Sequence, residues 1–139
     1  MSVFQPVFSL GNVSSIPARS AWDLTATLYL PSATSNAVAY AAVIANDDVV
    51  RFRLFSGDDT TALLTATNAT PSTNGTTVTI DTRGVVATTP AAVTIKLSAT
   101  DTDRAVGSYE FLLDVQDISD GSRWQPACRG TIAIESGPA

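Results

Sequence analysis

Apolar and polar residues alternate with a period of two along much of this chain, and this alternation constrains the fold more than any other feature. In the stretch GSYEFLLDVQD, residues 107–117, every second residue is apolar and most of the residues between are polar. The apolar positions are Tyr109, Phe111, Leu113 and Val115. Successive side chains of a β-strand point to opposite faces, so the pattern predicts a strand with one buried face.

The same pattern recurs along the chain, with Gly, Pro, Asn and Asp between the alternating stretches. It predicts strands over residues 22–30, 49–55, 61–67, 76–81, 92–98, 107–117 and 128–134. The alanine-rich stretch 37–45 fits either a helix or a buried strand, and its short length favours a strand. Trp22 is in phase with apolar residues of its stretch and is predicted to lie in the core.

Seven or eight short strands with turn residues between them are typical of an antiparallel β-sandwich. A single sheet would leave one apolar face in water, so two packed sheets are expected. We predict an all-β, two-sheet, immunoglobulin-like sandwich that lacks the Cys…Trp…Cys pattern of antibody domains.

The chain has 139 residues, which fits one domain, predicted to span residues 21–139. Residues 1–20 contain two prolines and a glycine between short apolar pieces. Proline cannot donate a ladder hydrogen bond, so this segment is either an edge strand or an arm that lies across a neighbouring molecule. If it is an arm, its deletion should leave a folded domain.

Charge and composition exclude several classes of partner. The net charge is −5, and the eight basic residues are scattered, so no nucleic-acid or anionic-membrane contact is expected. No apolar run reaches the ~18 residues that a membrane span needs. The single cysteine, Cys128, rules out an intrachain disulfide and fits synthesis in a reducing cytosol.

The sequence lacks the usual catalytic groups, and we predict that the chain is not an enzyme and binds no cofactor. It contains no histidine, the commonest general base and metal ligand. Cys128 has Arg129 beside it but no base partner, and we expect it to be a small buried side chain. No Walker or dinucleotide-binding glycine pattern is present.

Aspartates cluster in the predicted loops and are expected to cap and tighten turns. Calcium is the best alternative use of such loops, and ATDTDR places Asp101 and Asp103 at alternate positions. The glycine and the distant glutamate of an EF-hand are missing, so we predict no metal site here.

Three aromatic residues are candidates for binding a partner or a sugar: Trp124, Tyr29 and Phe55. Trp124 lies in the predicted turn SDGSRWQP, where it is either exposed or folded back over the sheet edge. Tyr29 and Phe55 fall on the polar phase of their strands. Tryptophan and tyrosine are over-represented as interface anchors.

The C-terminal third, from LSATDTDRAVG to CRGTIAI, resembles the closing hairpin of small β-sandwich modules in tailed-phage structural proteins. The residues that carry the resemblance are Gly107, Tyr109, Phe111, Leu113, Gly130, Thr131, Ile132 and Ile134. The stretch VVRFRLFSGDDTTALL is also similar to the middle of these modules, so the resemblance covers about residues 45–135.

Such modules occur in baseplate upper proteins, in tail-fibre and neck proteins, and in capsid decoration proteins. The resemblance implies a virion structural protein, made in the host cytoplasm, that assembles with other virion proteins and with copies of itself. Unlike larger baseplate proteins, the chain has no coiled-coil stalk. A carbohydrate-binding or host-adhesion module, which reads a glycan through exposed aromatic rings, is the alternative.

Overall fold

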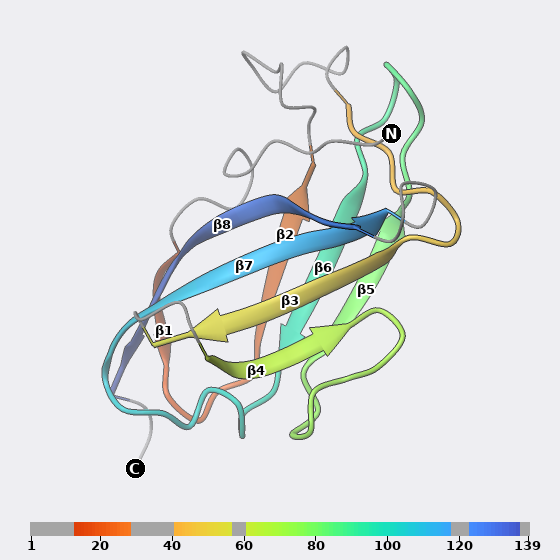
Figure 1. Ribbon diagram of the computed structural model, residues 1–139. Helices are drawn as coiled ribbons and strands as arrows, with labels where there is room; N and C mark the ends of the chain where they lie inside the picture. The colour runs from red at the N-terminus through yellow and green to blue at the C-terminus, as the bar shows by residue number, and fades with distance from the viewer. Residues whose placement is uncertain (1–12, 29–40, 57–60, 118–122, 137–139) are drawn as a thin grey trace.

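The computed structural model describes residues 13–28, 41–56, 61–117 and 123–136, and these ranges hold eight β-strands and no helix. The strands form two sheets packed face to face, which confirms the predicted all-β sandwich (Figure 1). The strands are β1 (Val13–Pro17), β2 (Trp22–Thr27), β3 (Val49–Phe55), β4 (Ala62–Thr67), β5 (Thr77–Thr82), β6 (Ala92–Leu97), β7 (Gly107–Asp117) and β8 (Arg123–Glu135).

The larger sheet has five strands in the order β1-β8-β7-β3-β4, and the smaller has three in the order β2-β6-β5. Neighbouring strands are antiparallel, as predicted, with one exception: β1 runs parallel to β8. The hairpin of β7 and β8 is the longest paired unit, and it lies at the centre of the larger sheet beside β3 (Figure 1).

The core lies between the sheets and is built from the alternating apolar residues of both. On β3, Val50, Phe52 and Leu54 are buried as the alternation predicted, and the Phe52 ring stacks on Phe111 of β7 with centroids 6.0 Å apart. The smaller sheet contributes Val93 and other alternate residues from its own inner face. Each large side chain buried in this way stabilises the fold by about 1.5–3 kcal/mol.

Trp22 does not lie in the core, and this prediction is wrong. Trp22 is 38% exposed to solvent. Trp22 is the first residue of β2 and pairs with Leu97, the last residue of β6, so it stands at the end of the smaller sheet. The alternation is correct for the following residues of β2, Leu24 and Ala26, which are buried.

The strand predicted over residues 37–45 is absent from its described part, residues 41–45. The backbone there makes single hydrogen bonds: the Ala42 N–H donates to the Leu28 carbonyl and the Ile44 N–H to the Arg83 carbonyl. Both side chains are buried. This segment is therefore apolar because it is buried, although it forms no continuous ladder of strand hydrogen bonds. Composition alone does not distinguish a buried strand from a buried segment of this kind.

Part of the N-terminal segment belongs to the sandwich. Strand β1 is an edge strand of the larger sheet, and the Ile16 side chain is fully buried in the core. Deletion of residues 1–20 would therefore remove core packing, contrary to the expectation that the remainder folds unaffected. Residues 1–12, where an arm was considered, lie outside the described residues.

Candidate interaction surface

The outer face of the larger sheet carries a compact set of large polar and aromatic side chains. The sheet register places Arg51 of β3 opposite Asp114 of β7, and Arg53 opposite Leu112. Leu112 is in turn paired with Arg129 of β8. We call this surface the arginine face, and it consists of Arg51, Arg53, Phe55, Glu110, Leu112, Asp114, Trp124 and Arg129.

Two arginines converge on one aspartate at the centre of the arginine face. The Arg51 Nε and Nη2 atoms donate to the two carboxylate oxygens of Asp114, at 3.0 and 2.5 Å. Arg53 Nη2 donates to the same carboxylate at 3.1 Å. The Asp114 side chain is only 4% exposed although it points away from the core. Paired, charge-assisted bonds of this kind compensate the cost of removing a carboxylate from water.

Trp124 covers this ion cluster from the neighbouring strand. The guanidinium carbon of Arg51 lies 3.9 Å from the centre of the Trp124 ring. A cation over an aromatic face is attracted by the ring quadrupole, by about 0.5–2 kcal/mol depending on solvent exposure. The indole and the arginine therefore hold each other in one conformation.

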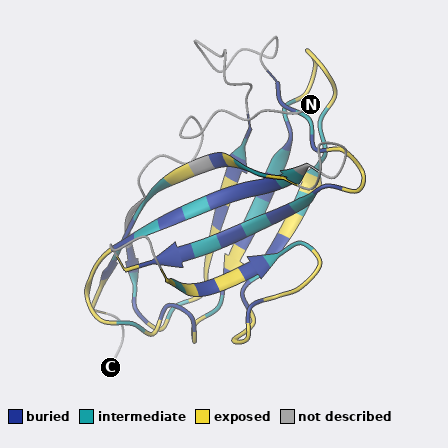
Figure 2. Cartoon of the chain, viewed as in Figure 1, coloured by how far each residue is buried: buried dark blue, intermediate teal, exposed yellow. Residues whose placement is uncertain are grey.

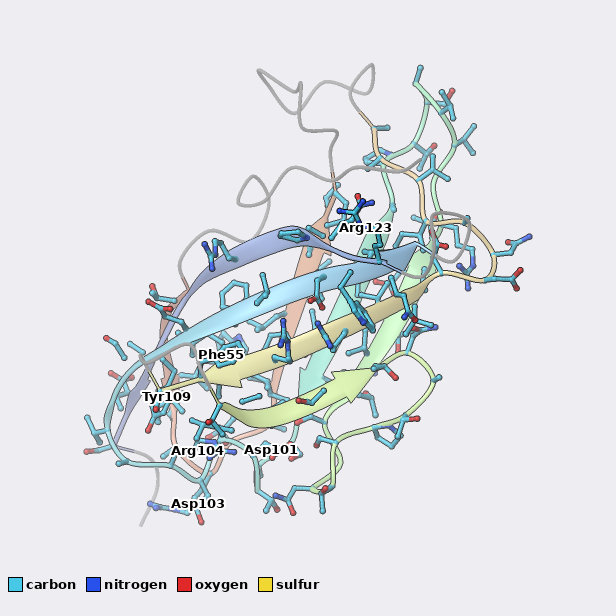
Figure 3. The ribbon with its side chains drawn as sticks, in the orientation of Figure 1. Phe55, Asp101, Asp103, Arg104, Tyr109 and Arg123 are labelled. Atoms are coloured by element: carbon cyan, nitrogen blue, oxygen red, sulfur yellow. The ribbon has the colours of Figure 1, made fainter. Side chains whose placement is uncertain are left out.

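A hollow of about 380 Å³ opens next to the ion cluster, between β3, β7 and β8. Its walls include Arg53, Phe55, Glu110, Leu112 and Arg129. The Arg53 guanidinium carbon lies 5.3 Å from the centre of the Phe55 ring, and Phe55 is only 6% exposed. Figure 3 shows Phe55 near the C-terminal end of β3. The hollow thus combines an apolar wall with two guanidinium groups.

The outer faces of the two sheets differ in character. Apart from Arg129, the members of the arginine face are half-buried or buried, and in Figure 2 β3 and β7 alternate between buried and intermediate residues. On the smaller sheet, the outward residues Thr25, Thr79 and Lys96 are exposed. The larger sheet therefore presents large side chains that contact one another, and the smaller presents exposed threonines and a lysine.

The loop considered for calcium is held by protein groups. The Asp101 carboxylate, almost fully buried, accepts hydrogen bonds from the hydroxyls of Ser72 at 2.6 Å and Thr76 at 2.5 Å, and from the Asn74 amide at 3.4 Å. Arg104 lies 3.9 Å from the same carboxylate. Asp101 and Arg104 lie together at one end of the sandwich (Figure 3).

Burial by itself raises the pKa of Asp101, but the hydrogen bonds from Ser72, Thr76 and Asn74 and the charge of Arg104 outweigh it. The pKa of Asp101 is therefore below its ordinary value. The other candidate ligand, Asp103, forms an exposed ion pair with Arg19 at 3.7 Å. Asp101 ties two loops together, a longer-range role than the local turn expected from the sequence.

The structure places the residues that were predicted as site candidates in different settings. Trp124 lies within β8 and not in a turn, because β8 begins at Arg123 and passes Pro126 with a register shift. Phe55 is on the predicted outward phase but is buried there by its neighbours. Tyr29 lies outside the described residues, and so does the side chain of Cys128.

Sequence reasoning missed the residues that organise this surface: Arg51, Arg53, Asp114 and Arg129. A usable signal was present in the outward arginines of VVRFRLF and the single acidic residue on the outward phase in the middle of LLDVQD. Their pairing depends on β3 lying next to β7, and a single sequence does not reveal which strands are neighbours.

No protein family matches the chain, and no curated protein is significantly similar to it. Within the described ranges, no helix could cross a membrane and no group of three or more acidic, cysteine or histidine side chains could hold a metal ion.

Proposed function

We propose that this chain is a non-enzymatic structural protein of a bacteriophage virion, a capsid decoration, tail or baseplate component, that acts through protein–protein assembly. It is made in the host cytoplasm and incorporated into the particle, where it contacts other virion proteins and copies of itself. The phage assignment depends on the resemblance of residues 45–135 to small sandwich modules of tailed-phage proteins.

The observation that supports an assembly role most strongly is the arginine face. Arginine and aromatic residues are enriched at protein interfaces, and lysine and aspartate are depleted there. Here Arg51, Arg53 and Trp124 are already held in place by Asp114 and by each other. Because these side chains are ordered before binding, little conformational entropy is lost when a partner covers them.

The immunoglobulin-like assignment forms part of the same proposal. We label β2 to β8 as strands B, C, C′, D, E, F and G. The sheets then read B-E-D and, apart from the edge strand β1, G-F-C-C′, an order that supports this assignment. The Tyr109 hydroxyl, near the start of β7, donates to the Ala105 carbonyl at 2.6 Å. A tyrosine at the start of strand F that bonds back to the chain just upstream is a hallmark of these domains.

The stacked rings of Phe52 and Phe111 are buried in the core and come from the neighbouring strands β3 and β7. Phe111 follows Tyr109 by two residues, the place that the second cysteine takes in antibody domains. Phe52 lies on β3, which corresponds to the strand of the antibody tryptophan. An aromatic pair in place of the disulfide and tryptophan fits a domain folded in a reducing compartment.

Mass spectrometry of purified particles tests the proposed function. We expect peptides of this chain at a stoichiometry comparable with the other structural proteins, in particles purified through a density gradient. A mock gradient from cells that express the chain alone gives the background. Particles that contain no more of the chain than this background would contradict the proposal.

A further inference from the structure

We propose that the arginine face binds an acidic surface of a second copy of this chain, in a head-to-tail contact. This inference names a partner and a surface for the proposed assembly role, and so rests on it. The contact joins the hollow beside Phe55 on one copy to carboxylate side chains on a different part of the next copy.

The distribution of charge favours this partner. The arginine face holds three arginines and two carboxylates, a net charge of +1, within a chain whose net charge is −5. The other residues of each copy therefore have a net charge of −6, although two of their aspartates, Asp48 and Asp101, are buried. Complementary potentials steer association and select orientation. A second copy supplies the acidic surface that the arginine face attracts.

Arg129 is the residue on which the contact depends most directly. Its side chain is exposed at the wall of the hollow, and it makes no ion pair with a described carboxylate. Arg51 and Arg53, by contrast, share Asp114. A guanidinium group binds a carboxylate through two parallel hydrogen bonds, and the apolar wall formed by Phe55 and Leu112 excludes water from one side of such a pair.

The same charge pattern disfavours a symmetric dimer. In a two-fold contact through the arginine face, the same patch of both copies meets itself, so two surfaces that each have a net charge of +1 face one another. Like charges placed together oppose association. A head-to-tail contact avoids this repulsion, and it continues to a ring or an open chain because each copy keeps one unused surface.

Sedimentation analysis of the full chain at low and high salt tests the inference. At about 20 mM salt, we expect species larger than dimers to form as the concentration rises, and to dissociate at about 500 mM salt because screening weakens the contact. Arg129→Glu should weaken the association at least tenfold. The matched control is Lys96→Glu, which makes the same change of charge on the outer face of the smaller sheet and should leave association equal or stronger.

A chain that stays monomeric at low salt and high concentration would overturn the inference. So would association that stops at a dimer, or that Lys96→Glu weakens as much as Arg129→Glu. Circular dichroism of both variants establishes that each is folded. A chain that is monomeric in solution and yet present in purified particles would remove the head-to-tail contact and leave the proposed function standing.

Discussion

The guanidinium carbon of Arg51 lies 3.9 Å from the centre of the Trp124 ring, although the two residues belong to strands separated by β7. The same guanidinium donates two hydrogen bonds to Asp114 on the intervening strand. Three neighbouring strands are thus connected through side chains on the outer face of the sheet.

Asp114→Ala should lower the free energy of unfolding by about 3 kcal/mol, because it leaves two partly buried arginines without a counter-charge. Asp103→Ala is the matched control, since its ion pair with Arg19 is exposed, and it should cost less than about 1 kcal/mol. Urea unfolding at neutral pH measures both values. Equal losses in the two variants would mean that Asp114 is not the centre of an energetically coupled cluster.

Arg51→Ala should shift the fluorescence emission of Trp124 to longer wavelength, because the arginine no longer covers the ring and water reaches the indole. The chain has two tryptophans, so the measurement uses a Trp22→Phe background. Lys96→Ala in the same background is the control and should leave the emission unchanged. An Arg51→Ala spectrum that coincides with that of the parent would contradict the stacking.

The lowered pKa of Asp101 makes part of the stability depend on pH. A carboxyl group whose folded pKa lies below its unfolded value stabilises the fold above the unfolded pKa, and this contribution is lost as pH falls through the folded pKa. Asp101→Asn should therefore give a shallower loss of stability below about pH 4. It should also cost about 1–3 kcal/mol at pH 7, since the Ser72 and Thr76 hydroxyls lose a charged acceptor.

Unfolding free energies of wild type, Asp101→Asn and Asp103→Asn between pH 7 and pH 2 test this prediction. Asp103→Asn is the control, because Asp103 lies in the same loop but its carboxylate is exposed. If all three profiles are parallel throughout the acid range, the hydrogen bonds to Asp101 do not set its titration.

Gly84 is a position where the backbone requires glycine. Its φ is +87°, and an added Cβ would lie 2.8 Å from three backbone atoms, those of Ala42, Thr89 and Ala91. Gly84→Ala should therefore combine the cost of a positive φ, about 1–2 kcal/mol, with about 1–3 kcal/mol of overpacking. Gly75→Ala is the control, because Gly75 has a φ of +96° but its Cβ would meet only the Ser98 Cβ, at 3.9 Å.

Thermal or urea unfolding distinguishes the two glycine variants. Gly84→Ala should be less stable than Gly75→Ala by the overpacking contribution. Similar losses in both variants would show that the close approach of the backbone around Gly84 relaxes without cost.

The strands could be predicted from the sequence because local alternation determines which side chains face the core. The stretches containing Phe52, Val93 and Phe111 have this pattern, and all three residues are buried. The prediction failed for Trp22, because alternation does not say where the opposing sheet ends. It also failed for Trp124, because Pro126 suggests a turn and the register shift that accommodates it within β8 has no local signal.

The candidate surface could be predicted only in part, because it is made by contacts between strands distant in sequence. The outward phase of Arg51, Arg53 and Phe55 follows from β3 alone. The burial of Phe55 and the pairing of Arg51 with Asp114 and Trp124 depend on the order β8-β7-β3. Strand order is set by packing of the whole domain and not by the periodicity of any one strand.

Hydroxyl-radical footprinting of the chain, free and incorporated into particles, tests most directly whether the arginine face is the surface used in assembly. Labelling of Trp124 and Leu112 should fall severalfold on incorporation, while labelling of Trp22, at the end of the smaller sheet, should stay the same. Protection of Trp22 with unchanged labelling of Trp124 and Leu112 would contradict the account.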